Sequence, residues 1–294
     1  MYPNEGSRFT FVPCADQSPE WLEVRRSGIG GSDVAAVMGL SPWCGPYEVW
    51  CRKTGLVEAP DVGGSPAVRW GHLLEGVVAD EYARLHPDRR VVNPRGVMRS
   101  VERPWAQASL DRVVRDPVRG WGVLEVKTAG MHSARMWDGG VPLHYLTQVQ
   151  HYLDVTGYGW AVVAVLIGGQ DYREYEVAPD ARDIRAIRSD VDLFWHCNVE
   201  AGVEPPTGVQ SCEARLLAAR HPSGDGTYTE APDLVASLVD ARERVREAKA
   251  REAEVAARVR DLVAAEGSEG VEGAGHRVTW VRTEKRQQLR VKEI

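Results

Sequence analysis

The sequence has few cysteines, and no two of them have C-x-x-C spacing. The five thiols are scattered at positions 14, 44, 51, 197 and 212, which indicates neither a disulfide framework nor a zinc site. Long hydrophobic runs are also missing. The longest, WAVVAVLI at 160–167, is far shorter than the roughly 20 residues that span a bilayer and predicts a buried strand. No basic region followed by an apolar one opens the chain, so we expect no signal peptide, no membrane association and a cytoplasmic location.

Excess positive charge is absent as well. The net charge of −6 over 294 residues argues against a protein that coats nucleic acid by charge alone. Local arginine clusters remain available to line a channel, at 25–26, at 89–90 and at 112, 115 and 119. A hydrophobic content of 43% is enough for one large domain, or for one domain with an appendage.

Helical and strand-like segments follow one another along the first two thirds of the chain. A helix begins at SDVAAVMG, with Ser32 or Asp33 as its N-cap and Gly39 as its stop. After a Gly/Pro-rich loop at 59–66, helical periodicity returns in WGHLLEGVVADEYARLH. Strands are expected within 91–128 and at 160–167 and 171–177, and further helices at 142–157, 181–199 and 213–220. This order predicts an α/β fold, a central mixed sheet flanked by helices.

The last third has a different character. We divide the chain into a main domain at 1–205, a loop-rich linker at 206–231 and a C-terminal helical and strand tail at 232–294. A long helix at 233–265 carries an apolar seam that needs a partner, which can be the chain's own domain, another helix or another subunit. We expect a packed helical hairpin there and not an extended coiled coil. The seam consists of Leu238, Ala241, Val245, Ala248, Val255, Val259 and Leu262. The end of the chain, GHRVTWVRTEKRQQLRVKEI, begins as a strand and is then expected to be basic and mobile.

One segment concentrates charged residues in a strand-turn-strand pattern, ASLDRVVRDPVRGWGVLEVKTAG at 108–130. Because side chains alternate along a strand, Glu125 and Lys127 share one face. The Asp-Pro and Gly signals predict a hairpin turn, across which Asp111 and Glu125 can meet. Two converging carboxylates repel each other unless a cation lies between them, and such oxygen ligands suit Mg²⁺ or Mn²⁺.

Several motifs in one order resemble a known family. Glu75 on a helix, Asp111 on a strand, LEVK on the next strand and QVQHY on a later helix resemble the PD-(D/E)XK nuclease superfamily. Within it, the segment WLEVRRSGIGGSDVAAVMG is similar to the W-x-x-x-R-x-x-x-x-x-x-S-[DE]-V signature of the lambda-exonuclease-like, YqaJ-type viral recombinases. The resemblance covers residues 19–200. It departs from the family pattern at SLD, where a Pro-Asp or Glu-Asp pair is commoner.

This resemblance implies roles for the charged residues. Asp111, Glu125 and the carbonyl of Val126 would bind Mg²⁺, with Mn²⁺ as a substitute, and Glu75 would complete the site from its helix. Two ions about 3.5–4 Å apart would stabilise the attacking water and the leaving 3′ oxygen. Lys127 would orient or deprotonate that water and offset transition-state charge.

The helix YLTQVQHYL resembles the Q-x-x-x-Y motif of the superfamily. Gln148 and Tyr152 are four residues apart and share a face, whereas Gln150 lies elsewhere on the circumference. The resemblance implies that Gln148 and Gln150 support the lysine, the water or the phosphate, and that Tyr152 contributes to the binding of DNA. We assign no role to the neighbouring His151, nor to His72.

The glycine turn SGIGGSD at 27–33 is suited to an anion. Gly30 and Gly31 allow close approach to backbone N–H groups, and the helix that follows directs its positive end the same way. In the family, Arg25 aligns with an arginine that binds the 5′ phosphate of the degraded strand, and Ser32 with a serine that contacts phosphate.

The expected activity is a Mg²⁺-dependent 5′ to 3′ exonuclease on duplex DNA ends, which leaves 3′ single strands for phage-type recombination by annealing. The family implies a homo-oligomer, such as a trimeric ring, a single-strand annealing protein as partner, and the host cytoplasm if the chain is phage-encoded. One alternative is an endonuclease or nickase of the same superfamily in DNA defence or repair. Another is a DNA-end binding module without catalysis, which the presence of Asp111, Glu125 and Lys127 disfavours.

Overall fold

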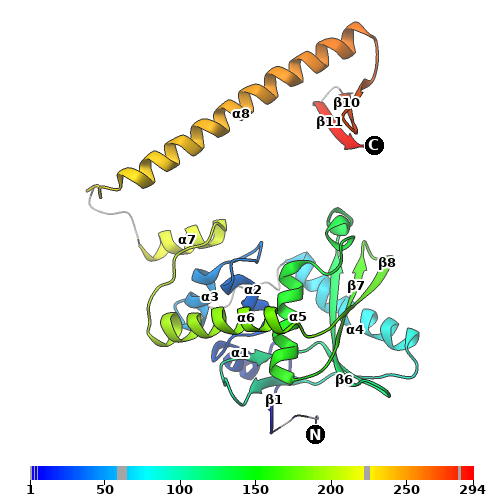
Figure 1. Cartoon of the computed structure of the whole chain (residues 1–294), viewed down its shortest axis with the longest axis vertical. Coiled ribbons are helices and arrows are strands. Elements are labelled where there is room, and N and C mark those ends of the chain that lie inside the picture. Colours follow the sequence, from blue (N-terminus) through cyan, green and yellow to red (C-terminus); the bar gives the residue numbers. More distant parts are fainter. Residues whose placement is uncertain (1, 3, 5, 58–64, 222–225, 284–285) are drawn as a thin grey trace. The chain divides into compact units, whose positions relative to one another are not determined.

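The computed structural model describes the chain except for residues 1, 3, 5, 58–64, 222–225 and 284–285. The chain divides into two compact units, Met1–Ser223 and Gly224–Ile294 (Figure 1). Most of the predicted loop at 59–66 lies outside the described residues. None of the described helices is both long and apolar enough to span a bilayer.

A five-stranded sheet with the order β2-β5-β6-β7-β8 forms the centre of the first unit. β6 and β7 are parallel, and the other neighbouring pairs are antiparallel. The strands are β2 (Arg90–Val92), β5 (Arg112–Asp116), β6 (Gly120–Ala129), β7 (Ala161–Ile167) and β8 (Asp171–Val177). The mixed sheet confirms the predicted fold class, and β7 is the strand expected from the apolar run.

A second, antiparallel sheet has the order β1-β3-β4. Its strands are β1 (Phe9–Pro13), β3 (Gly96–Ser100) and β4 (Gln107–Ala108). Ile29, in the glycine turn, forms an isolated bridge with Ala106, and Gln107 Nε2 donates to the carbonyl of Val24 at 2.8 Å. This sheet therefore holds the segment that carries Arg25 and the glycines.

Helices cover both faces of the central sheet (Figure 1). They are α1 (Pro19–Arg26), α2 (Gly31–Val37), α3 (Pro46–Lys53), α4 (Pro66–Leu85), the 3₁₀ turn η2 (Met131–Trp137), α5 (Leu143–Thr156), α6 (Ala181–Phe194), the π turn η3 (Trp195–Glu200) and α7 (Ser211–Arg220). Along β7, Val163 and Val165 join the core that contains α5, whereas Val162 and Ala164 join the core that contains α4. Because alternate side chains enter different cores, slippage of β7 by one residue would exchange them, which sets the register beside β6.

The ends of two helices show how glycine shapes the site. Gly157 ends α5 with a φ of 67°, the left-handed conformation expected at that position. The predicted N-cap of α2 was wrong: Gly30 occupies the cap, with a φ of −93°. Asp33 lies in the first turn instead, and its Oδ2 accepts a hydrogen bond from the Gly30 N–H at 3.2 Å.

The predicted linker at 206–231 is shared between the two units. Its helix α7 is fixed to the first unit by Glu213, which is fully buried. Glu213 Oε1 accepts a hydrogen bond from the backbone N–H of Glu48 at 2.8 Å, in the first turn of α3. A carboxylate is favourable at a helix N-terminus, so α7 is a part of the first unit.

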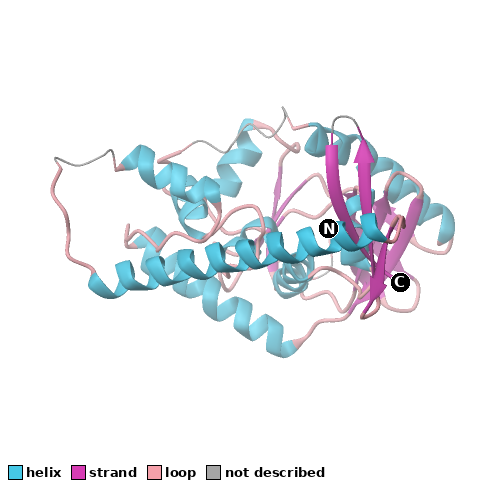
Figure 2. Ribbon diagram, turned by 90° about the horizontal axis from the view of Figure 1, so that it is seen from above, coloured by secondary structure: helices cyan, strands magenta, loops and turns pink. Residues whose placement is uncertain are grey.

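The second unit contains one long helix, α8 (Pro232–Ala265), followed by an antiparallel sheet of β9 (Gly270–Gly273), β10 (His276–Thr283) and β11 (Arg286–Glu293) (Figure 2). The predicted helical hairpin was wrong: among the described residues of this unit, α8 has no second helix beside it. The basic end is not a mobile tail, because β11 pairs with β10 from Arg286 to Glu293.

Candidate active site

The β5–β6 hairpin brings two carboxylates together. In its antiparallel register Arg112 pairs with Leu124, so Asp111, the residue before β5, lies opposite Glu125. Asp111 Oδ2 also accepts a hydrogen bond from the backbone N–H of Val126 at 2.8 Å. The strand pairing thus produces the convergence that the turn signals predicted.

Glu125 is the centre of a hydrogen-bonded cluster. Its Oε1 accepts hydrogen bonds from Lys127 Nζ at 2.5 Å and from Gln148 Nε2 at 2.6 Å. Gln148 Nε2 also donates to the Tyr152 hydroxyl at 3.0 Å. The second carboxylate oxygen, Glu125 Oε2, is buried and has no hydrogen-bond partner among the described residues. One oxygen of Glu125 is therefore held by the protein while the other is left for a ligand.

The cluster holds two buried carboxyl groups beside a single ammonium group. Burial, and then the neighbouring Glu125 carboxylate, raise the pKa of Asp111 well above its usual range. Burial also raises the pKa of Glu125, against the opposing effect of Lys127. Burial disfavours the charged form of Lys127, yet Glu125 and Asp111 outweigh it and raise the lysine pKa. Lys127 is therefore a cation at neutral pH.

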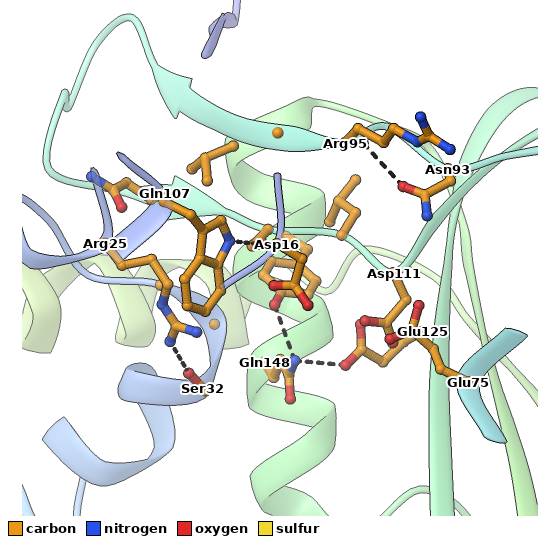
Figure 3. Close-up of a pocket in the computed structure, with 18 of the residues that line it drawn as sticks. Asp16, Arg25, Ser32, Glu75, Asn93, Arg95, Gln107, Asp111, Glu125 and Gln148 are labelled. Carbon is orange, nitrogen blue, oxygen red and sulfur yellow. Dashed lines mark hydrogen bonds between the residues drawn. The ribbon is translucent and has the colours of Figure 1, made fainter. Parts of the chain in front are cut away.

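Glu75 reaches this region from α4, on the opposite side from Arg25 (Figure 3). Its Oε1 accepts a hydrogen bond from Arg112 Nη1 at 2.6 Å. Arg112 had been noted only as one of a cluster of arginines. The alternation of side chains along β5 was the available signal for this pairing. It directs Arg112 to the face opposite Asp111, toward α4.

The donor set fits a hard divalent cation through Asp111 and Glu125. Both are carboxylates, which are the ligands that Mg²⁺ prefers, and Glu125 Oε2 is a buried oxygen without a partner. Glu75 is paired with Arg112, and no group of three or more His, Cys, Asp or Glu side chains is arranged around a common point in the described part of the chain. The carboxylate pair, without Glu75, is what the fold assembles.

The glycine turn places a guanidinium on the other side of the same cavity (Figure 3). Arg25 Nη2 donates to Ser32 Oγ at 2.6 Å, and the guanidinium carbon lies 4.6 Å from the centre of the Trp21 ring. Trp21 is itself held by a hydrogen bond from its Nε1 to Ser109 Oγ at 3.3 Å. The Arg25 side chain is thus supported on one face and directed toward the start of α2.

Gly31 lets α2 approach α5 closely. A Cβ on Gly31 would lie 2.5 Å from Tyr152 Cε1 and 2.8 Å from Gln148 Cγ, which is too close for carbon atoms. The neighbouring Gly30 has no atom nearer than 3.8 Å to such a Cβ. Gly31 therefore acts through packing, in addition to any contact that its backbone makes with an anion.

A buried ion pair anchors the glycine turn at 27–33. Lys53 Nζ lies 2.7 Å from Asp33 Oδ2 and donates to the carbonyl of Arg25 at 2.7 Å. Burial lowers the pKa of Lys53 to about 8, while Lys53 and then Arg52 overcome the effect of burial on Asp33 and lower its pKa. Both partners are therefore charged at neutral pH. No sequence motif singled out Lys53, which lies at the end of α3.

A cavity of about 270 Å³ joins these groups. Ten of the predicted site residues line it: Arg25, Gly30, Gly31, Ser32, Glu75, Asp111, Glu125, Lys127, Gln148 and Tyr152. The remaining side chain, Gln150, is not brought to the cluster. Gln150 donates to the carbonyl of Ala178 at 2.9 Å and accepts from the N–H of Asp180 at 3.0 Å. It lies two positions after Gln148 on the same helix, so the two side chains point about 200° apart around the helix axis.

Polar residues without a predicted role also line the cavity, among them His72, Asn93 and Arg95. Arg95 has a φ of 49°, and its N–H donates to Asn93 Oδ1 at 3.0 Å. The Asn-Pro pair at 93–94 was the available signal for this turn. Of the predicted arginine clusters, Arg89 is paired with Asp116 at 2.9 Å, whereas Arg25 faces the cavity.

Comparisons with known proteins agree with this architecture. A family model described as YqaJ-like viral recombinase domain matches residues 20–159. The uncharacterized protein YqaJ of Bacillus subtilis (strain 168) is 35% identical over 231 residues, which cover 78% of this chain and 69% of that protein. Protein D345L of African swine fever virus (strain Badajoz 1971 Vero-adapted) is 36% identical over 76 residues, 24% of this chain and 21% of that protein.

Among solved structures, an alkaline exonuclease from Laribacter hongkongensis, LHK-Exo, matches with a TM-score of 0.52 at 20% identity, over 69% of this chain and 99% of that chain. The fold is that of the PD-(D/E)XK nucleases. The chain belongs to the YqaJ-type viral recombinase family.

Proposed function

We propose that the chain is a Mg²⁺-dependent 5′ to 3′ exonuclease that degrades one strand from the ends of duplex DNA. The observation that carries the proposal is the single cavity shared by Arg25 with Ser32 and by the Asp111, Glu125 and Lys127 cluster. A terminal phosphate and the first scissile phosphate of one strand can then be held together. Closed circular DNA has no terminal phosphate for Arg25 to bind.

Asp111 and Glu125 would hold the divalent ion, with the carbonyl of Val126 as a further ligand. Mn²⁺ would substitute for Mg²⁺, and two ions per site would serve the proposed chemistry. When bound, the metal supplies Lewis-acid polarisation of the scissile phosphate and lowers the pKa of attacking water. Among the described residues Glu75 is turned to Arg112, so its contribution would require that this pair opens.

The chain's own groups contribute positioning and charge. Gln148 holds Glu125 through Oε1, and the Tyr152 hydroxyl holds Gln148 in turn. Gln148 and Tyr152 thus fix the orientation of the Glu125 carboxylate and of its free Oε2. Because this arrangement is preorganised, the carboxylate does not have to reorient during the reaction. The Lys127 ammonium, 2.5 Å from Glu125 Oε1, would orient the water and offset the negative charge that develops on the phosphate.

Arg25 would give the reaction its polarity. A guanidinium grips a terminal phosphate through two parallel hydrogen bonds, and a terminal phosphate carries more charge than a bridging diester. The N–H groups at the start of α2 add donors of the same kind. The proposal extends to the biological role, in which the 3′ single strands serve recombination by annealing. The chain would act as a homo-oligomer, such as a trimeric ring, together with a single-strand annealing protein.

The test compares linear duplexes with 5′-phosphate or 5′-hydroxyl ends and closed circles, all in Mg²⁺. We expect the phosphorylated end to be degraded several-fold faster, and Arg25→Ala to remove that ratio while some cleavage remains. Arg26→Ala is the matched control, because Arg26 is paired with Glu23 at 3.0 Å and does not line the cavity. Equal rates on the two ends, or efficient cutting of circles, would favour an endonuclease or nickase. End binding without any cleavage would indicate the catalytically silent module.

A further inference from the structure

A second cavity, of about 390 Å³, adjoins the same cluster. The two cavities share six lining residues, namely Ser32, His72, Glu75, Asp111, Lys127 and Gln148. Its volume lies in the range of small-molecule sites, roughly 300–1,000 Å³. Whereas the first cavity contains Arg25 and Arg95, the second contains no arginine among its lining residues. The residues found only in the second cavity are mostly small or apolar, and they include the three rings of Trp43, His144 and Tyr145. Such a lining suits a ligand group with an apolar face.

Three rings form this aromatic wall. Trp43 meets His144 edge-on, with ring centres 4.9 Å apart, and is tilted against Tyr145 at 6.0 Å. His144 and Tyr145 have ring centres 4.1 Å apart. Lys127 Nζ lies 4.9 Å from the centre of the Tyr145 ring, so the aromatic wall adjoins the catalytic cluster directly.

Two residues of the aromatic wall could make further contacts with a ligand. Trp43 is 61% exposed, although indole is among the most favourable groups to bury. His144 is only 8% exposed, and its Nε2 has no hydrogen-bond partner among the described residues. A buried imidazole nitrogen without a partner is unfavourable. An occupant with a flat apolar face and polar edges would satisfy both residues.

We propose that this second cavity binds the nucleobase of a nucleotide that flanks the scissile phosphate, by stacking against Trp43 and the adjoining rings. The inference rests on the proposed function and names a further contact of the same site. Bases stack on aromatic side chains irrespective of sequence, because every base has a π face. A base bound in the second cavity would let the strand bend away from its complement at the point of cleavage. No base preference is expected.

The test is a binding cycle on 5′-phosphorylated duplexes labelled at a distant 3′ end. Affinity is measured by fluorescence anisotropy in Ca²⁺, a hard cation that also takes oxygen ligands. The intact duplex is compared with duplexes that carry an abasic site at the terminal or at the second nucleotide. We expect one of these abasic duplexes to bind the wild type about tenfold more weakly. The abasic position that matters identifies which of the two bases is bound.

Variants of Trp43 complete the cycle. Trp43→Leu should bind the intact duplex about as weakly as the wild type binds the abasic one, and should no longer distinguish the two. Trp43→Phe should restore the difference. Trp70, which is also exposed but lines neither cavity, is the control, and Trp70→Leu should behave as wild type.

The outcomes separate the two proposals. If the wild type degrades duplex ends with a 5′-phosphate preference but binds both abasic duplexes as tightly as the intact one, the base site is wrong and the exonuclease stands. An abasic penalty of the same size in Trp43→Leu and wild type would also overturn it. If the wild type neither cleaves nor binds duplex ends, both proposals fail. Retention of the 5′-phosphate preference by Trp43→Leu shows that this variant is folded.

Discussion

Replacing Gly31 with alanine should disturb the contact between α2 and α5 on which the site depends. The added Cβ would lie 2.5 Å from Tyr152 Cε1 and 2.8 Å from Gln148 Cγ. Neither side chain has room to turn away, because both are buried and Gln148 is hydrogen-bonded to Glu125 and to Tyr152. Helix α2 must therefore shift. We expect this overpacking to lower the free energy of unfolding by about 1–3 kcal/mol.

The same shift should affect activity more than stability. It moves Ser32, and the turn that supports Arg25, relative to the carboxylates on β6. A misplacement on the order of 1 Å can reduce an enzymatic rate by about 10²-fold. Gly31→Ala should therefore lose cleavage under conditions in which the variant is still folded.

Gly30→Ala is the matched control for this experiment. Its added Cβ would have only Arg25 Nη2 and Asp33 Oδ2 nearby, both at 3.8 Å, and the φ of −93° suits alanine. The free energy of unfolding should change by less than about 1 kcal/mol, the scale of an N-cap substitution. Urea denaturation measures the stabilities, and digestion of end-labelled duplex measures the rates. If the two variants have equal stability and equal activity, the packing argument is refuted.

Glu125→Ala and Lys127→Ala should each lower cleavage by at least about 10²-fold with the circular dichroism spectrum unchanged, since they remove charge that stabilises the transition state; a near wild-type rate in either would remove the site assignment. Asp111→Ala should abolish Mg²⁺ binding in calorimetry. A chain that ends near residue 230 should still cleave short duplexes but lose assembly or partner binding in gel filtration, whereas joint loss of folding and chemistry would make the tail part of the core. Burial lowers the pKa of His151 from 6.5 to about 4, so its contribution to stability is complete above pH 6.5 and should decline by about 3 kcal/mol as the pH falls to 4. Urea titrations of His151→Gln should lack this part of the decline, and a variant with the pH profile of the wild type would contradict the prediction.

Much of the site was predictable because its determinants are local. The alternation of LEVK places Glu125 and Lys127 on one face whatever surrounds the strand, and the Asp-Pro and Gly signals bring Asp111 to Glu125 by a short turn. Four-residue spacing on a helix likewise joins Gln148 to Tyr152. The same geometry already separated Gln150 from them, and the structure places it against the backbone at 178–180.

The second unit shows where local patterns mislead. The apolar seam of α8 is typical of a helix that packs against another helix, yet the chain continues from α8 into a sheet. The basic residues near the C-terminus indicate a mobile segment by composition, but their alternation along β11 is compatible with pairing to β10. Composition describes solubility and charge, whereas strand pairing depends on a partner strand elsewhere in the chain.

The sequence by itself therefore determined the mixed α/β fold, the hairpin with its carboxylates and lysine, and the helix that supports them, because each depends on residues a few positions apart. Only the tertiary structure decided that Glu75 pairs with Arg112, that Lys53 and Asp33 anchor the turn beside Arg25, and that the aromatic wall adjoins the cluster. Such contacts join segments that are distant along the chain. Their formation depends on burial and on the free energy of competing partners, which no local spacing encodes.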